Sequence, residues 1–271
     1  MTMQSTWRVL APGPSDRVLL TVDFGPGRRE AGFSDLVANL APEPVVWEPV
    51  FAPQTADPVT GTDPHGCVSR WLDDVRNAGL EVCGVLGYCA GGALARQTGD
   101  LLRTRGMPEP PVVLLDPSHV DGDLIQELFA TSVQGYAELL SEDQIRAALA
   151  AAAGFTGALG SNIGTQAPAE LAEAMRSLQA LYDGVVQTVC DMLDADEEVS
   201  RGFSERFAAF LSYLVTAGRA SAARGGSATV IVSGNHHLPD GFGVEKHRLP
   251  VSRAALLADP AVARIVAEAL R

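Results

Sequence analysis

The residue best suited to chemistry in this chain is Cys89, in the segment 87–92 with the sequence Gly-Tyr-Cys-Ala-Gly-Gly. Residues 81–86 form a short apolar run typical of a buried strand, and residues 90–102 carry apolar side chains at helical spacing. A strand, a tight G-x-C-x-G turn and a helix form a nucleophile elbow, which more often carries serine. Small neighbours permit the strained turn, which leaves its central side chain at the edge of the sheet. We therefore predict that Cys89 is a thiol nucleophile.

An acid and a base are expected at the same edge of the sheet. Asp116 ends the next apolar run, residues 111–116, and neighbouring parallel strands end side by side. Residues 228–232 are predicted as the last strand, and the G-x-H turn after it places His236. We expect His236 to take the thiol proton while Asp116 holds its tautomer. The adjacent His237 is the alternative base, although packed aromatics are usual at its position.

The oxyanion hole of such a site requires backbone N–H donors aimed at the developing charge. The amide of Ala90, directly after the nucleophile, is the first candidate. The second is expected from the loop after the first core strand, where Pro26 has no N–H. Gly27 is therefore the predicted donor and Gly25 the reserve. The alternative is that these glycines only permit a tight turn.

The elements that position these residues alternate between strands and helices in two parts of the chain. This alternation predicts an α/β fold with a mostly parallel sheet covered by helices on both faces. The predicted strands are 17–24, 44–51, 81–86, 111–116 and 228–232, and the predicted helices between and after them are 33–40, 67–78, 90–102 and 260–270.

Between these parts, residues 121–224 show only helical patterns. We predict that this segment is a helical lid inserted into a core formed by residues 1–120 and 225–271. The alternative is a second helical domain with a role of its own.

Composition excludes several classes of function. The 271 residues are 46% hydrophobic and 20% charged, as in ordinary globular proteins, and the net charge of −13 disfavours nucleic acid and anionic membranes as partners. Residues 1–7 show no signal-peptide pattern, and no run approaches the roughly 20 apolar residues of a membrane span. The four cysteines show no disulfide or metal-binding spacing. We expect a reduced, cytoplasmic enzyme without cofactor or metal.

The motifs together resemble those of the α/β-hydrolase thioesterases of polyketide and nonribosomal peptide biosynthesis. Residues 24–27 (Phe-Gly-Pro-Gly) are similar to that family's oxyanion loop, although its usual order is Phe-Pro-Gly. Residues 87–95 match its G-H-S-x-G-G-x-x-A elbow with cysteine in place of serine, Leu-Leu-Asp at 114–116 matches its strand-end acid, and 234–236 match its G-x-H.

The resemblance implies an acyl or peptidyl substrate on the phosphopantetheine arm of a carrier protein, which would be the partner. Cys89 would take the acyl group and release it by hydrolysis, cyclisation or transfer to an amine or alcohol. Other interpretations remain open. The G-x-C-x-G-G box also resembles dienelactone hydrolases, which act on small esters and lactones, and the longer polyhydroxyalkanoate synthases. The chain could also be a non-catalytic binding protein with a hydrolase fold.

Overall fold

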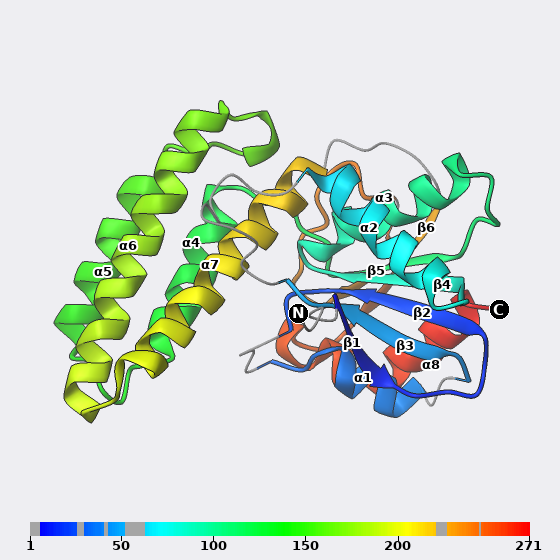
Figure 1. The fold of residues 1–271 in the computed structure, drawn as a ribbon, viewed down its shortest axis with the longest axis horizontal. Coiled ribbons are helices and arrows are strands. Elements are labelled where there is room, and N and C mark those ends of the chain that lie inside the picture. The colour runs from blue at the N-terminus through cyan, green and yellow to red at the C-terminus, as the bar shows by residue number, and fades with distance from the viewer. Residues whose placement is uncertain (1–5, 26–29, 41–42, 52–62, 221–226, 244) are drawn as a thin grey trace. The chain divides into compact units, whose positions relative to one another are not determined.

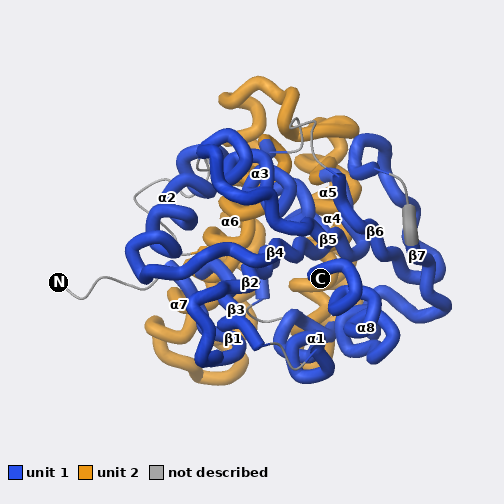
Figure 2. Tube along the Cα trace, turned by 90° about the vertical axis from the view of Figure 1, so that its right-hand side faces the viewer, with its two compact units in different colours: residues 1–50, 63–119, 220–271 blue, residues 51–62, 120–219 orange. Residues whose placement is uncertain are grey.

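The computed structural model describes most of the chain in two compact units, drawn in different colours in Figure 2. The first unit comprises Met1–Val50, Asp63–His119 and Ala220–Arg271, and the second comprises Phe51–Thr62 and Val120–Arg219. The described residues are 6–25, 30–40, 43–51, 63–220, 227–243 and 245–271.

A seven-stranded sheet forms the centre of the first unit, with the strand order β1-β3-β2-β4-β5-β6-β7 (Figure 1). The first strand, β1, pairs with β3 in the antiparallel direction, and every other neighbouring pair is parallel. The strands are β1 (Trp7–Ala11), β2 (Arg17–Val22), β3 (Val45–Pro49), β4 (Glu81–Tyr88), β5 (Val112–Leu115), β6 (Ala228–Ser233) and β7 (Glu245–Leu249). The predicted mostly parallel sheet is confirmed.

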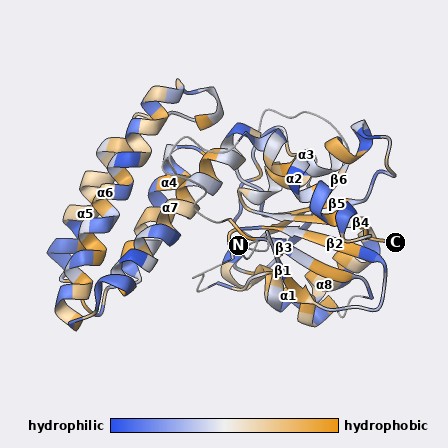
Figure 3. Cartoon of the chain, in the orientation of Figure 1, coloured by the Kyte–Doolittle hydropathy of each residue, from blue (hydrophilic) through white to orange (hydrophobic). Residues whose placement is uncertain are grey.

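Helices cover both faces of this sheet, because its central strands are apolar on both sides. Figure 1 shows α2 and α3 on one face and α1 and α8 on the other. The continuous apolar colour of the central strands is visible in Figure 3. The helices are α1 (Phe33–Leu40), α2 (Pro64–Asn77), α3 (Gly91–Thr104) and α8 (Pro260–Ala269).

One prediction about the sheet is wrong: β6 is not its last strand. The chain continues into β7, which pairs with β6 in parallel, Val232 opposite Arg248 and Ser233 opposite Leu249. The sequence Glu-Lys-His-Arg-Leu of β7 is mostly charged, because this strand forms an edge of the sheet. Apolar periodicity therefore gave no signal for β7. The His236 turn leaves the second-last strand, not the last one.

The second unit contains helices where helical patterns were predicted. They are α4 (Gly122–Gln134), α5 (Glu142–Thr156), α6 (Pro168–Leu193) and α7 (Glu197–Ala220), with the short 3₁₀ helix η1 (Ile163–Thr165) between α5 and α6. Ser141 begins α5 with a capping box, in which Gln144 is the reciprocal partner. None of the helices in the described ranges is long and apolar enough to span a membrane. The role of this unit as a lid stays a prediction.

A cluster of aromatic side chains lies in the core of the second unit. The rings of Tyr182 and Phe207 stack with centroids 4.0 Å apart, and Phe129 meets Phe207 edge-on at 6.0 Å. The hydroxyl oxygens of Tyr136 and Tyr182 lie 3.0 Å apart. Burial, followed by this hydrogen bond, raises the pKa of Tyr182 above its usual range. Tyr182 is therefore a neutral packing residue.

Candidate active site

Cys89 lies at a sharp turn between β4 and α3, as predicted for an elbow (Figure 1). Its φ of 51° is in the left-handed region, which non-glycine residues rarely occupy. Such a conformation costs about 1–3 kcal/mol and persists where the surrounding structure enforces it, often at functional sites. The side chain is only 5% exposed.

The glycines of the elbow are required by close packing. A Cβ on Gly87 would lie 2.6 Å from Cβ of Ala95 and 2.8 Å from Cα of Gly92, closer than carbon atoms approach. A Cβ on Gly92 would lie 3.1 Å from Cβ of Pro117. The small residues around Cys89 therefore let α3 begin directly against β4 and against the turn that follows β5.

Backbone hydrogen bonds join the elbow to that turn. The amide of Cys89 donates to the carbonyl of Leu115 at 3.0 Å, and the amide of Ser118 donates to the carbonyl of Cys89 at 3.2 Å. Asp116 thus leaves the sheet beside Cys89, as predicted from the parallel strands. Ala90 is the N-cap residue of α3, and the first amides of a helix have no acceptor within the helix.

The carboxylate of Asp116 is bound by Ser233 at the end of β6. Asp116 is fully buried, with a φ of 41°. Its Oδ1 accepts a hydrogen bond from the amide of Ser233, and its Oδ2 accepts one from the Ser233 hydroxyl, both at 2.7 Å. Each carboxylate oxygen thus has a donor from a single residue, which the sequence analysis did not single out.

His236 is half-buried, and its ring hydrogen-bonds to backbone. Its Nε2 lies 3.0 Å from the carbonyl oxygen of Pro117, to which it donates in the matching tautomer. Nη1 of Arg248 donates to the carbonyls of Ser233, Gly234 and His236 at 3.0, 2.9 and 2.9 Å and so holds the turn. The structure therefore brings the two segments together without a hydrogen bond between the Asp116 carboxylate and the His236 ring. His237 is exposed.

Arg253, which the sequence analysis missed, contacts the Cys89 sulfur. Nη2 of Arg253 donates to Sγ of Cys89 at 2.8 Å, and its Cζ lies 5.8 Å from the ring centroid of Tyr88. Both contacts keep the guanidinium at the elbow. Arg253 could not be found from the sequence because β7 was not predicted. Arg253 lies four residues after the end of that strand, in the order Pro-Val-Ser-Arg.

Arg253 is held by a short, well-anchored element. It begins the 3₁₀ helix η2 (Arg253–Ala258), in which Leu256 and Leu257 are fully buried. The carbonyl of Ala254 accepts from the amide of Ala31 at 3.0 Å. Two residues before Arg253, the carbonyl of Val251 accepts from the amide of Gly234 at 3.0 Å. The guanidinium therefore comes from a fixed backbone.

The predicted second oxyanion donor, Gly27, lies outside the described residues, as does Pro26. Gly25 lies against the ion pair of Arg8 and Glu48: a Cβ on Gly25 would be 2.7 Å from Nη2 of Arg8 and 2.9 Å from Oε2 of Glu48. The close approach of this ion pair thus explains why residue 25 is glycine, and no oxyanion role is needed to explain it. Asp23, just after β2, is 3% exposed, so this edge of the sheet also carries a second buried carboxyl group.

Two other cysteines show what burial does to a thiol without a contacting cation. Burial raises the pKa of Cys67 from 9.0 to about 11, although Arg70 partly opposes this shift. Burial also raises the pKa of Cys83, whose Sγ lies 3.3 Å from the carbonyl oxygen of Val18. Both favour the neutral thiol.

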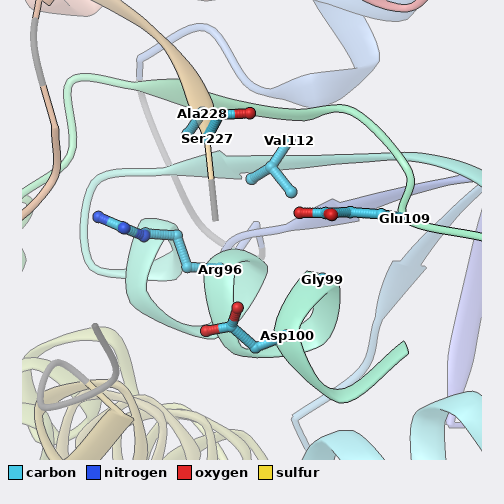
Figure 4. A pocket seen from close by; sticks show the side chains of 7 residues that line it. All are labelled: Arg96, Gly99, Asp100, Glu109, Val112, Ser227 and Ala228. Carbon is cyan, nitrogen blue, oxygen red and sulfur yellow. The ribbon is translucent and has the colours of Figure 1, made fainter. Parts of the chain in front are cut away.

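A small pocket in the first unit lies at the other end of the strands. Figure 4 shows its lining residues, which come from α3 and from the starts of β5 and β6. Val112 and Ala228 are opposite one another at those starts. Cys89 and Asp116 instead follow the ends of β4 and β5, so this pocket is separate from the candidate active site.

Comparisons with solved structures find the same architecture. The chain matches a four-domain nonribosomal peptide synthetase bound to AMP and glycine at 16% identity and a TM-score of 0.56, over 97% of this chain. It spans only 20% of that synthetase. It matches the Vlm2 thioesterase domain bound with a dodecadepsipeptide at 18% identity and a TM-score of 0.52, over 98% of this chain and 96% of that one.

A third match is the NocB thioesterase domain in covalent complex with a fluorophosphonate nocardicin G analogue, at 12% identity and a TM-score of 0.50, over 98% of this chain and all of that one. This chain has the α/β-hydrolase fold. No protein-family model matches it, and no curated protein matches it significantly. Within this hydrolase fold, the carboxyl edge of the sheet carries Cys89, Asp116 and Arg253.

Proposed function

We propose that this protein is a thioesterase-like acyl-transfer enzyme in which Cys89 is the nucleophile. Cys89 takes an acyl or peptidyl group from the thioester of a carrier protein. It then releases the group by hydrolysis, cyclisation or transfer to an amine or alcohol. The setting is the biosynthesis of polyketides or nonribosomal peptides.

The observation that carries this proposal is the conformation of Cys89 at the elbow. A cysteine in the left-handed backbone conformation between a central strand and a helix costs free energy. A purely structural turn would favour glycine at this position. The similarity of the fold to thioesterase domains supports thioesters as substrates. The cysteine suits this chemistry, because a thiol is more nucleophilic at neutral pH than a hydroxyl.

The remaining roles follow the sequence predictions and stay proposals. The amides of Ala90 and Gly27 would stabilise the tetrahedral oxyanion. His236 would serve as base, oriented by Asp116 after a rearrangement that frees both from their present partners, Pro117 and Ser233. The helical unit would act as a lid.

Intact-protein mass spectrometry with acyl-pantetheine thioesters tests the proposal. We expect a single acyl adduct on the wild-type protein and on the control variant Cys83→Ala, whose thiol favours its neutral form. Cys89→Ala should give no adduct. An adduct that persists in Cys89→Ala, or the absence of an adduct with every acyl thioester tried, would overturn the assignment.

A second candidate function is non-catalytic binding within the same fold. It is favoured by one observation: Asp116 and His236 hydrogen-bond to Ser233 and Pro117 rather than to one another. A binding protein would retain acyl-pantetheine in equilibrium dialysis without forming a covalent adduct. The catalytic protein would show the adduct.

A further inference from the structure

We propose that Arg253 holds Cys89 as a thiolate and that acyl-Cys89 passes its acyl group to a second thiol in preference to water. This inference rests on the proposed function of Cys89 as the acyl-carrying residue. It adds a catalytic residue, Arg253, and a chemical class of acceptor.

The contact between Arg253 and Cys89 favours the ionised sulfur. Nη2 of Arg253 lies 2.8 Å from Sγ, within hydrogen-bonding distance. A guanidinium is charged at every working pH, and a cation next to a thiol stabilises the thiolate. Burial of the sulfur opposes its ionisation, as at Cys67, but it also leaves little water to screen the attraction of the contacting guanidinium. The Tyr88 ring beside the guanidinium adds a cation–π contact.

A guanidinium differs from a histidine because it cannot accept a proton. Water or an alcohol attacking acyl-Cys89 must lose a proton to a base, and Arg253 cannot serve as one. Asp116 and His236 are the predicted acid and base, and their hydrogen bonds to Ser233 and Pro117 hold them in other arrangements. Arg253 therefore supports acylation of Cys89 and gives no help to hydrolysis.

A thiol acceptor avoids this difficulty. A free thiol is a few per cent ionised near neutral pH, so its thiolate attacks without a base. Arg253 attracts that anion and stabilises the departing one. Because the donor and the product are both thioesters, the exchange has no large driving force in either direction.

The proposed steps balance without any co-reactant. The Cys89 thiolate attacks the carbonyl carbon of the donor thioester, a new S–C bond forms, and the donor's C–S bond breaks to release its thiolate. The acceptor thiolate then attacks acyl-Cys89 and expels the Cys89 thiolate. Protons exchange only between the free thiols and solvent, and Arg253 stays protonated throughout.

The first experiment measures how acyl-Cys89 is discharged. The wild-type protein is loaded with an acyl group, separated from donor, and placed in buffer alone, with pantetheine, or with an alkylamine at equal concentration. We expect the adduct to disappear at least tenfold faster with pantetheine than in buffer, with acyl-pantetheine as product. Equal rates in buffer and pantetheine would overturn the inference, as would faster discharge by the amine.

The second experiment tests Arg253 through the pH profile of Cys89 alkylation by iodoacetamide, followed by intact mass. Arg253→Met should move the midpoint of the profile to higher pH, whereas Arg253→Lys should stay close to wild type. Arg264→Met removes an exposed arginine from α8 and is the matched control. An unchanged profile in Arg253→Met would contradict the role of Arg253. If that variant does not fold, Arg253→Gln replaces it in the comparison with Arg253→Lys.

Arg253→His supplies a group that can accept a proton at the same place. We expect this variant to hydrolyse acyl-Cys89 at least tenfold faster than wild type, and no gain in hydrolysis would count against the inference. The two levels of proposal fail differently. If no adduct forms on Cys89, the proposed function fails; if the adduct forms but water discharges it as fast as thiol, only the present inference fails.

Discussion

Two turns at the carboxyl edge of the sheet differ in what their side chains contact. The elbow after β4 places the sulfur of Cys89 against the guanidinium of Arg253. The turn after β6 is instead joined to the segment after β5: Ser233 binds the Asp116 carboxylate, and the His236 ring binds the carbonyl of Pro117. The first turn holds its sulfur against a cation, whereas the polar side chains of the second hydrogen-bond to the segment that follows β5.

The three residue types thus reach one edge of the sheet without a hydrogen bond between the Asp116 carboxylate and the His236 ring. Cysteine, aspartate and histidine all follow strands of one sheet, yet hydrogen-bonding donors nearer to the aspartate satisfy it first. A buried carboxylate is stabilised by whichever N–H and O–H groups reach it, and Ser233 supplies both. The following predictions test whether the two turns differ in function as they do in contacts.

The largest effect is expected from Cys89→Ser. A neighbouring cation can ionise a thiol, but a hydroxyl needs a base to become nucleophilic. We expect the rate of thiol exchange from acyl-pantetheine to fall at least about a hundredfold. Chromatography of the thioester products measures this rate. Full activity with the same ratio of thiol exchange to hydrolysis in Cys89→Ser would show that the thiol has no special role.

The next largest effect is expected from Arg253→Met. Loss of a charge-assisted hydrogen bond to the thiolate, worth about 1.5–3 kcal/mol, should slow acylation of Cys89 about tenfold to a hundredfold. Arg253→Lys should recover part of this loss, because it keeps the charge without the planar fork. Stopped-flow release of pantetheine gives the rate. Equal acylation rates for Arg253→Met and Arg264→Met would show that Arg253 has no role in acylation.

Asp116→Ala should act mainly on stability. It leaves the amide and the hydroxyl of the buried Ser233 without their acceptors, which costs about 2–4 kcal/mol. Urea unfolding of the full chain measures this loss, and Asp116→Asn, which keeps one acceptor oxygen, should lose less. A stable Asp116→Ala protein with acylation abolished would instead support the predicted triad.

A thiol outside the elbow, that of Cys67, gives a pH test. The Cys67 pKa is raised in the folded protein, so its contribution to stability is complete below pH 9 and is lost as the pH rises through about 11. Two pKa units correspond to about 2–3 kcal/mol. Cys67→Ala should lose less stability than wild type over this range in urea unfolding. An identical loss in both proteins would exclude Cys67 as the cause.

The smallest effect is expected from His236→Gln. If the ring serves only to bind the carbonyl of Pro117, an amide N–H can replace it, and acylation should change less than about threefold. The exposed neighbour gives the control His237→Gln. A hundredfold fall in the acylation rate of His236→Gln, but not of His237→Gln, would support His236 as the base. The two turns would then belong to one catalytic site.

Much of the fold could be predicted, because apolar runs and their spacing report burial directly. The strands 81–88 and 112–115 and the helix after Cys89 lie where the patterns placed them. The strand β7 could not be predicted, because an edge strand with charged residues has no apolar pattern. Because β7 was missed, the turn that carries His236 was expected after the last strand, whereas it follows the second-last one.

The sequence by itself determined the elbow, because Gly87 and Gly92 allow its close packing and their spacing from Cys89 is local. It also determined that Asp116 follows a neighbouring strand. The tertiary structure alone decided which side chain meets the sulfur. Arg253 and Cys89 are far apart in the chain and come together only through the packing of η2 against α1, α8 and β6. The local sequence pattern predicts which element carries a side chain. Which group that side chain contacts depends on long-range packing and on competition among buried hydrogen-bonding groups.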